Sequence, residues 1–276
     1  MGLGVRGGVA VGGGGVPGIL GVMVDGALTG ATSETAEMDE VAWERWYASR
    51  EGVGSGRPSS QLVVEAGALA PGRALDVGCG EGADALWLAE RGWQVLAVDF
   101  SASALRRGKA QAVDLGRVVA ARVMWMRADA MTWAGLNAPP EPSPAPASNP
   151  GAGAGAGAGG RAAGRVSRFE TRFDLVSAQF LHVPADRRPA MLARLCGVVA
   201  PGGSLLVVGH DPADLGLGIP RPEAGMLCEA RELAGLLDPA VWEVLVAQSR
   251  PRAVMGSGGG EIVVRDAVLH ARRRAS

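Results

Sequence analysis

The stretch from Arg73 to Ser101 constrains the fold of this chain more than any other part of it. An apolar run that ends at Val77 predicts a buried strand, and a second apolar run, which starts at Val95, ends on Asp99. Between the two runs, a glycine-rich turn leads into a segment whose apolar residues recur at helical spacing. Strand, turn, helix and strand in this order predict a βαβ unit, in which the two strands lie parallel.

The glycine-rich turn predicts that this unit binds a nucleoside. Gly78, Gly80 and Gly82 let backbone N–H groups approach a ligand where a Cβ would collide, and the N-terminus of the next helix adds a partial positive charge. Asp99, at the tip of the second strand, is placed to accept hydrogen bonds from a ribose diol. The same turn also fits the dinucleotide pattern G-x-G-x-x-G/A, with Ala83 in the last position, so NAD is an alternative ligand.

Asp76 favours a different cofactor. Its carboxylate lies two residues before the first glycine, where it can hold a cationic amine and where it would repel a pyrophosphate. From Asp76 through Gly82, and again from Val98 to Ser101, the chain resembles the class I S-adenosylmethionine-dependent methyltransferases. The resemblance implies S-adenosylmethionine as cofactor and methyltransferase activity. It also implies a Rossmann-like α/β fold, with a doubly wound, mostly parallel seven-stranded sheet that ends in a C-terminal antiparallel hairpin.

The resemblance further implies which residues bind the cofactor. A strand from Val123 to Met126 precedes Asp129, so a third acidic residue reaches the carboxyl ends of the strands, where open α/β sheets bind ligands. In similar methyltransferases an aspartate at this point accepts the adenine amino group, although an aspartate in such a turn is often only a cap. The implied cofactor-binding residues are Asp76, Gly78, Cys79, Gly80, Gly82, Asp99, Phe100, Asp129, Ala130 and Gln179.

The remaining apolar patterns predict the other elements of this fold. The Phe173-Asp174 strand and the turn at Pro201-Gly202-Gly203 also resemble segments of the same family. Ser101 is expected to cap a helix, and Pro58 to lie in the first turn of another. We expect helices over about 41–47, 58–68, 104–113, 185–199 and 229–237, and further strands over 173–178, 204–208, 242–248 and 262–271.

Five residues are candidates for the substrate side of the site, and each has a purely structural alternative. Trp43 and Tyr47 share one helix face and could pack against a sulfonium, or could simply cover the core. Arg57 could reach the methionine carboxylate of the cofactor or remain on the surface. His182 follows the fourth strand, where a general base could sit, but it could equally stack on the cofactor or fill space. His210 leaves the fifth strand at the same edge.

Two segments interrupt the globular pattern. Residues 1–37 are glycine-rich and predict disorder, or an over-extended start with initiation at Met23 or Met38. Residues 138–168 combine a proline tract with a glycine–alanine repeat, which predicts a disordered insertion. The chain is therefore expected to form one methyltransferase domain over 38–276, interrupted by this insertion.

Composition narrows the expected partners and setting. The formal net charge is −1 and no basic stripe is evident, so we expect no nucleic acid partner. Cys79, Cys196 and Cys228 lack metal-ligand spacing and are odd in number, which favours a reduced, cytoplasmic protein without a metal site. No apolar run is long enough to span a membrane. The sequence leaves the oligomeric state open.

Three functions remain to be distinguished. The leading one is methyl transfer to a small molecule, because the stretches around Trp43 and Arg57 resemble a bacterial subgroup related to thiopurine and tellurite-resistance methyltransferases. An NAD-dependent oxidoreductase is the second, although the single tyrosine, Tyr47, precedes the glycine turn and cannot form a downstream Tyr-x-x-x-Lys pair. The third is a binding protein that holds S-adenosylmethionine without catalysing its reaction.

Overall fold

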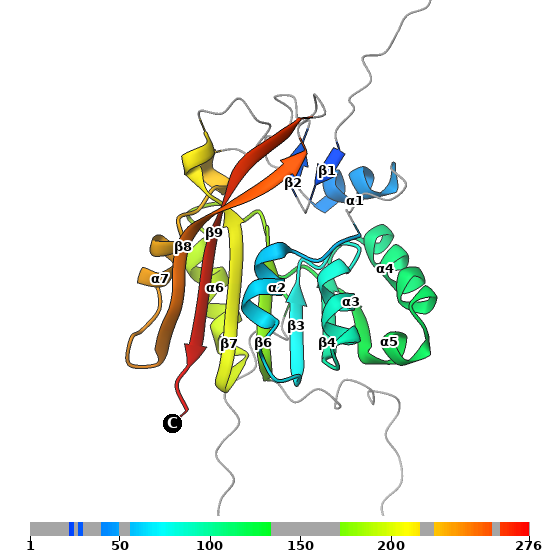
Figure 1. The fold of residues 1–276 in the computed structure, drawn as a ribbon, viewed down its shortest axis with the longest axis horizontal. Helices are drawn as coiled ribbons and strands as arrows, with labels where there is room; N and C mark the ends of the chain where they lie inside the picture. Colours follow the sequence, from blue (N-terminus) through cyan, green and yellow to red (C-terminus); the bar gives the residue numbers. More distant parts are fainter. Residues whose placement is uncertain are drawn as a thin grey trace, which may run out of the picture.

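The computed structural model describes residues 22–24, 27–29, 40–49, 56–133, 172–215, 224–255 and 260–275. Within these residues a central sheet has seven strands in the order β5-β4-β3-β6-β7-β9-β8 (Figure 1). The strands are β3 (Arg73–Val77), β4 (Gln94–Asp99), β5 (Val123–Arg127), β6 (Phe173–Gln179), β7 (Val199–His210), β8 (Trp242–Met255) and β9 (Glu261–Arg273). β3 to β7 pair in parallel, whereas β9 pairs antiparallel with both β7 and β8. The predicted sheet and its final hairpin are confirmed.

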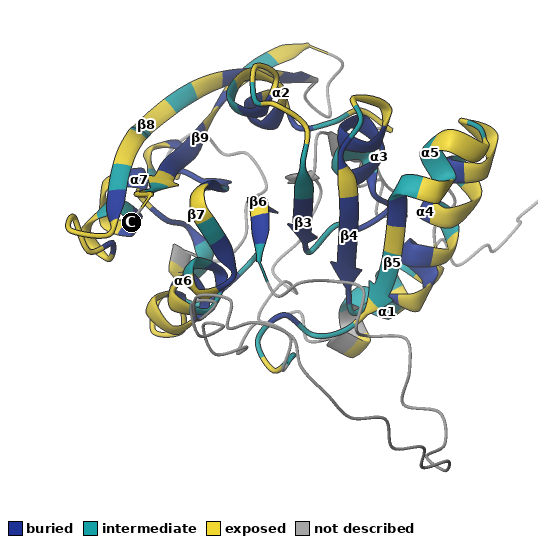
Figure 2. Cartoon of the chain, turned by 90° about the horizontal axis from the view of Figure 1, so that it is seen from below, coloured by how far each residue is buried: buried dark blue, intermediate teal, exposed yellow. Residues whose placement is uncertain are grey.

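Helices cover both faces of the sheet. One apolar cluster joins α2 (Ser60–Ala66), α3 (Ala83–Glu90) and α4 (Ala102–Asp114) to one face of the strands. A second cluster places α6 (Arg188–Gly197) and α7 (Ala230–Gly235) against the opposite face. α5 (Arg117–Arg122) packs beside α4 and β5, at the end of the sheet. Figure 2 shows that the strands between these layers are mostly buried and that the outer surfaces of α4 and α5 are exposed.

The carboxyl ends of the parallel strands meet at one edge, shown at the top in Figure 1. Helix α1 (Glu40–Ala48) lies above this edge and contacts α4. Two short 3₁₀ helices, η3 (Pro212–Asp214) and η4 (Ala224–Met226), follow β7. Every loop that follows a parallel strand therefore begins at the edge where α/β sheets bind ligands.

Several predicted boundaries differ from those observed. β7, β8 and β9 are longer than predicted. The pairing of β8 with β9 continues far beyond the apolar runs, and β7 pairs with β6 from Val199 and with β9 as far as His210. α2 begins at Ser60 behind Ser59, so Pro58 precedes this helix and does not lie in its first turn. The predicted cap is confirmed: the Ser101 side chain accepts a hydrogen bond from the N–H of Ala104, over 3.1 Å. α5 was not predicted. None of its residues is buried, although Val119 and Ala120 pack against the first apolar cluster.

The structure describes only a small part of the two segments that were predicted to be disordered. Within residues 1–37, β1 (Val22–Val24) and β2 (Ala27–Thr29) pair as a small antiparallel sheet. The predicted insertion at 138–168 lies outside the described residues.

A polar network ties α2 to the antiparallel end of the sheet. The Glu65 carboxylate accepts a hydrogen bond from Arg250 over 2.5 Å and contacts His270 Nδ1 at 2.8 Å. His270 Nε2 lies 3.1 Å from the Ser204 hydroxyl oxygen on β7. Beside this group, Arg252 forms an ion pair with the fully buried Asp266. These contacts hold polar side chains under α2, where apolar packing would otherwise be expected.

Glu65 should contribute stability that depends on pH. Burial raises the pKa of this carboxyl, but the hydrogen bonds from His270 and Arg250 outweigh burial and bring it below its usual value of 4.5. Its contribution is therefore complete above pH 4.5 and is lost as the pH falls through the lower folded-state pKa. Glu65→Gln should lower the free energy of unfolding by about 1–3 kcal/mol at pH 7 and by much less near about pH 3.5, measured by chemical denaturation.

Glu243→Gln is the matched control, since Glu243 pairs with Arg272 on the exposed surface. This substitution should leave stability almost unchanged, because exposed ion pairs contribute little. An equal loss in both variants would show that the Glu65 network is not a stabilising element.

Candidate active site

A cavity of about 260 Å³ opens at the edge where the parallel strands end. Its walls come from the glycine turn after β3, the tips of β4 and β5, the segment after β6, and helix α1. All ten residues implied to bind the cofactor line this cavity: Asp76, Gly78, Cys79, Gly80, Gly82, Asp99, Phe100, Asp129, Ala130 and Gln179. The fold therefore brings together residues that are spread over a hundred positions of the sequence.

The glycine turn uses a backbone conformation that other residues rarely adopt. Gly78, Gly80 and Gly82 have φ angles of +71°, +53° and +81°. A Cβ at Gly80 would lie 2.8 Å from the Tyr47 hydroxyl, and one at Gly82 would lie 2.2 Å from the Trp125 ring. The turn thus needs glycine both for its path and for the close approach of its neighbours.

Asp99 fixes this turn to the end of β4. One carboxylate oxygen accepts a hydrogen bond from the N–H of Gly80 over 2.9 Å, and the other accepts one from the N–H of Ser101 over 2.8 Å. Burial raises the pKa of Asp99, although these backbone hydrogen bonds lower it in part. Each oxygen keeps a second lone pair, so the carboxylate can still accept hydrogen bonds from a ligand in the cavity.

Two further cavity residues carry buried polar atoms that lack a partner among the described residues. Asp76 Oδ2 and Gln179 Oε1 have no hydrogen bond, whereas the Gln179 amide nitrogen donates to Ser177 over 3.0 Å. Burial raises the pKa of Asp76 well above its usual range, and the neighbouring Asp84 and Asp99 raise it further. A buried acceptor without a partner is costly, so both atoms fit a ligand that carries hydrogen-bond donors or positive charge.

Asp129 is engaged within its own turn. Its carboxylate accepts hydrogen bonds from the N–H of Met131 over 2.8 Å and from the Thr132 hydroxyl over 3.0 Å. The Asp129 side chain therefore caps its own turn. It also lines the cavity, beside Ala130. The two interpretations of Asp129 are thus compatible in this structure.

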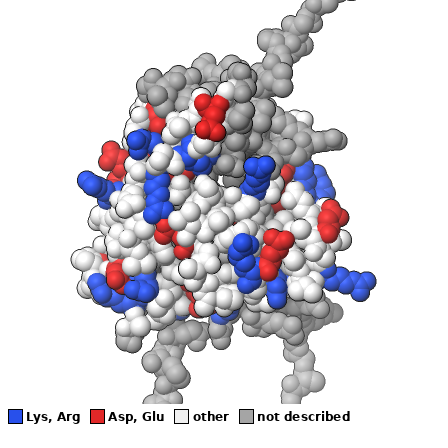
Figure 3. Space-filling model, viewed as in Figure 1, with Lys and Arg blue, Asp and Glu red and all other residues white. Residues whose placement is uncertain are grey.

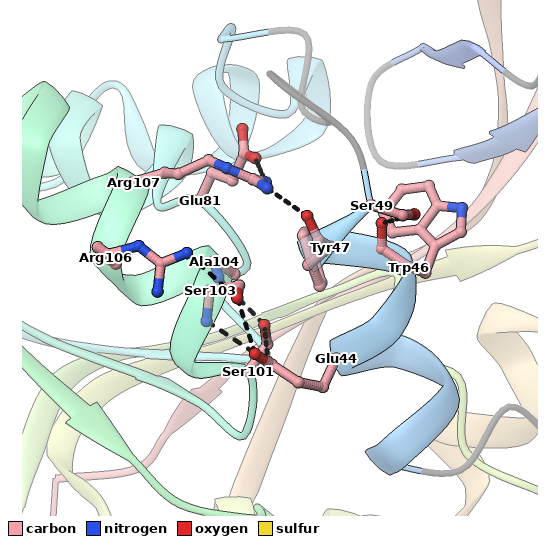
Figure 4. Close-up of polar contacts among 10 residues, drawn as sticks. All are labelled: Glu44, Trp46, Tyr47, Ser49, Glu81, Ser101, Ser103, Ala104, Arg106 and Arg107. Carbon is pink, nitrogen blue, oxygen red and sulfur yellow. Dashed lines mark hydrogen bonds and ion pairs between the residues drawn. The ribbon is translucent and has the colours of Figure 1, made fainter.

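Helix α1 covers the cavity and is attached to its wall by charged groups (Figure 4). Glu44 accepts hydrogen bonds from the hydroxyls of Ser101 and Ser103, over 2.6 and 2.7 Å. Burial raises the pKa of Glu44, but these bonds outweigh it and the net shift is downward. Arg107 donates to the Tyr47 carbonyl and forms an ion pair with Glu81 at 2.6 Å. Arg107 therefore links the covering helix to the glycine turn.

The substrate-side candidates divide between two cavities. Trp43, Tyr47, Arg57 and His182 line the large cavity, whereas His210 lines a smaller neighbouring one of about 50 Å³. The His182 ring lies between those of Trp43 and His210, with centroid distances of 5.6 and 5.5 Å. His182 Nε2 is buried and has no hydrogen bond among the described residues, and burial lowers the pKa of this imidazole from 6.5 to about 4.

The sequence did not reveal the attachment of α1. Glu44 and Arg107 were not identified as candidates, because both act through residues distant in the chain. The i, i+4 spacing of Trp43 and Tyr47 indicated only a shared helix face. The one local signal was Ser101 with Ser103 at the start of α4, since hydroxyls there can bind a carboxylate as well as cap a helix.

The other parts of the described chain show no competing site chemistry. No group of His, Cys, Asp and Glu among the described residues could hold a metal ion. None of the helices in the described ranges is long and apolar enough to cross a membrane. On the face shown in Figure 3, basic and acidic side chains are interspersed.

Comparison with known proteins agrees with this geometry. Residues 74–140 match a family described as "Methyltransferase domain". An uncharacterized methyltransferase of Mycobacterium tuberculosis is 37% identical over 135 residues, which cover 49% of this chain and 48% of that protein. A 2-heptyl-1-hydroxyquinolin-4(1H)-one methyltransferase of Mycobacteroides abscessus is 26% identical over 66% of this chain and 64% of its own length. The chain thus spans about half to two thirds of the length of these curated relatives.

A solved structure from work on the conversion of a disulfide bond into a thioacetal group during echinomycin biosynthesis has the same fold. Its TM-score is 0.58, at 20% identity, and the match covers 87% of this chain and 93% of that one. The matched domain contains β3, the glycine turn and Asp99, which form the cavity described above. The family match over residues 74–140, the fold and the cavity together support a class I S-adenosylmethionine-dependent methyltransferase with S-adenosylmethionine as cofactor.

Proposed function

We propose that this protein transfers a methyl group from S-adenosylmethionine to a small-molecule acceptor by in-line displacement. One observation carries the proposal: Asp76, Asp99 and Asp129, from the ends of three adjacent strands, line a single cavity together with the glycine turn. This arrangement suits a cofactor that carries an ammonium group, a ribose and an adenine in sequence.

We infer the following roles for the lining residues. Asp76 Oδ2 and Gln179 Oε1, which have no hydrogen-bond partner among the described residues, accept hydrogen bonds from the cofactor's ammonium group. Asp99 accepts hydrogen bonds from the ribose hydroxyls, and Asp129 with the Ala130 N–H meets the adenine edge. Gly78, Cys79, Gly80 and Gly82 surround the methionine half, and Phe100 covers the adenine. Arg57 binds the methionine carboxylate.

Bound S-adenosylmethionine supplies an electrophilic methyl group on a sulfonium. The chain's own residues hold the acceptor in line with that group and exclude water from it. Trp43 and Tyr47 offer aromatic faces toward the positive charge, on the helix that covers the cavity. His182 lies on the acceptor side as a hydrogen-bond acceptor for the nucleophile, and His210 lies behind it.

The small-molecule acceptor is supported by the covering helix α1 and by one relative. Glu44 and Arg107 attach this helix to the wall of the cavity, so it lies over part of the opening. The Mycobacteroides abscessus relative acts, by its name, on a substituted quinolone. Assignment to the subgroup of thiopurine and tellurite-resistance methyltransferases, an absence of nucleic acid partners, and a cytoplasmic location remain predictions.

The charges of the cavity argue against NAD. Five carboxylates line it, namely those of Asp76, Glu81, Asp84, Asp99 and Asp129, and Arg57 is the one cationic residue among its described lining. The pyrophosphate of NAD would place two negative charges beside this group, whereas a sulfonium and an ammonium would be attracted to it. A protein that binds S-adenosylmethionine without catalysing methyl transfer would have the same cavity. Only an activity measurement distinguishes it from an enzyme.

Calorimetry tests the cofactor assignment. The protein should bind S-adenosylmethionine and S-adenosylhomocysteine, and should bind NAD at least about a hundredfold more weakly. Tight binding of NAD with neither sulfur nucleoside bound would refute the proposal. Methyl transfer to a panel of thiols, amines and phenols, detected as S-adenosylhomocysteine release, then separates an enzyme from a binding protein.

Asp99→Ala should lower the affinity for S-adenosylhomocysteine by at least about a hundredfold, because it removes the ribose acceptor and the anchor of the Gly80 N–H. Asp174→Ala is the matched control, since Asp174 accepts a hydrogen bond from the Arg73 N–H over 2.7 Å outside the cavity. Thermal unfolding of both variants shows whether the fold persists. Unchanged affinity in folded Asp99→Ala would disprove the ribose role.

Glu44→Gln should weaken the attachment of α1 and speed the dissociation of S-adenosylhomocysteine by about tenfold, measured by stopped-flow fluorescence. Hydrogen exchange of the α1 amides should rise in the same variant. Arg45→Ala, an exposed change on the same helix, should alter neither quantity. Equal dissociation rates in the Glu44 variant and the wild-type protein would mean that α1 does not retain the cofactor.

A further inference from the structure

The smaller cavity lies directly behind the proposed methyl-transfer site. It shares five wall residues with the large cavity, namely Phe180, Leu181, His182, Val183 and Met191. Its volume of about 50 Å³ has room for about three or four water-sized groups. None of the cofactor roles inferred above requires this space, so it is available to the methyl acceptor.

The rest of the smaller cavity is almost entirely apolar. Its additional apolar walls are Ala178, Leu192, Leu195, Val207, Val208, Met226, Cys228 and Leu233, with Gly209 between them, and its additional polar walls are Arg188 and His210. Burial raises the pKa of the Cys228 thiol to about 11, so this side chain is uncharged at neutral pH. An apolar cavity of this kind favours binding of an alkyl substituent of the acceptor and disfavours a charged one.

Arg188 is the one cationic residue among the described walls of this cavity, and it is bound elsewhere. Its guanidinium donates to the carbonyl oxygens of Gly225, Leu227 and Val183, and forms an ion pair with Glu232 at 3.1 Å. These contacts satisfy the charge that an anionic ligand would need.

His182 stands where the two cavities meet. Its Nε2 atom is buried and has no partner among the described residues, and its lowered pKa keeps the imidazole neutral at pH 7. With its proton on Nδ1, the ring presents Nε2 as a hydrogen-bond acceptor. Aromatic rings flank the position, with Trp43 at 5.6 Å from His182 and Phe180 at 4.9 Å from His210.

We propose that the methyl acceptor is an uncharged aromatic ring that bears a hydroxyl or thiol group and a short alkyl substituent. The hydroxyl or thiol donates its hydrogen bond to His182 Nε2, and the substituent, of about two to four carbon atoms, occupies the smaller cavity. This inference rests on the proposed function and specifies its acceptor. It excludes an oxyanion such as tellurite, because Arg188, the one cationic residue among the described walls of the smaller cavity, is already paired.

The reaction balances without a further co-reactant. A bond forms between the methyl carbon and the acceptor's oxygen or sulfur as the carbon–sulfonium bond breaks, and that electron pair stays on the departing sulfur. The proton of the hydroxyl or thiol passes to His182 Nε2 and then to water. The products are the methylated ring, S-adenosylhomocysteine and one proton.

A series of phenols tests whether the alkyl substituent binds in the smaller cavity. In the presence of S-adenosylhomocysteine, affinity should rise about fourfold per methylene from phenol through 4-methylphenol to 4-propylphenol, and fall for 4-hexylphenol. 4-Hydroxybenzoate and tellurite should not bind detectably. A flat series, failure of every phenol to bind, or equal binding of the two anions would overturn the proposal.

Substitutions locate the substituent. Leu233→Phe and, independently, Cys228→Leu fill the smaller cavity. Each substitution should make phenol or 4-methylphenol the ligand with the highest affinity. Leu237→Phe and Cys196→Leu are the controls, since both side chains pack against the same apolar cluster and line neither cavity. Equal shifts in the controls would place the substituent elsewhere.

The hydrogen bond to His182 needs its own measurement. The wild-type protein should prefer 4-ethylphenol over 4-ethylanisole, which lacks the donor, by about tenfold, and His182→Phe should abolish this preference. S-adenosylhomocysteine binding is measured first in every variant. If the wild-type protein does not bind S-adenosylhomocysteine, the proposed function is wrong. If it binds S-adenosylhomocysteine but does not distinguish 4-ethylphenol from 4-ethylanisole, only this inference is wrong.

Discussion

The Asp99 carboxylate is the contact on which the site depends. Its two oxygens accept hydrogen bonds from the N–H of Gly80 and the N–H of Ser101, so one side chain joins the glycine turn to the start of α4. The turn after β3 has no regular secondary structure to hold it, and its positive φ angles offer many alternative paths. A charge-assisted hydrogen bond from the neighbouring strand selects one of them.

The same carboxylate shapes the electrostatics of the cavity. Asp99 and Asp84 lie close enough to Asp76 to raise its pKa, and burial raises it more than either. Burying like charges together costs stability, and no hydrogen bond from the described residues offsets this at Asp76 Oδ2. A cationic ligand removes that cost, so the affinity for an ammonium group and the instability of the empty cavity have one physical origin.

The sequence predicted what is determined locally. The βαβ unit around the glycine turn, the cap at Ser101 and the terminal hairpin follow from apolar spacing and turn chemistry, and all three are observed. Asp76, Asp99 and Asp129 could be placed at one edge because parallel strands end together. The unpredicted features are tertiary: the attachment of Glu44 to α4, the bridge made by Arg107, and the length of β8 and β9. His210 was expected at the same edge as His182, and the two rings do lie 5.5 Å apart. His182 lines both cavities but His210 lines only the smaller one, a difference that depends on packing and not on sequence spacing.

Helix α1 connects the two halves of the site. Through Glu44 and Arg107 it is bound to the start of α4 and to Glu81 in the glycine turn, beside the large cavity. Through Trp43 it contacts His182, which stands at the entrance to the smaller cavity. A ligand that orders the glycine turn thereby favours the position of α1, and by thermodynamic reciprocity an ordered α1 favours the ligand. If the acceptor binds against Trp43 and His182 as proposed, its affinity depends on whether the cofactor is present. The enclosed site would then form fully only when both reactants are bound, which excludes water from the sulfonium until an acceptor is in place.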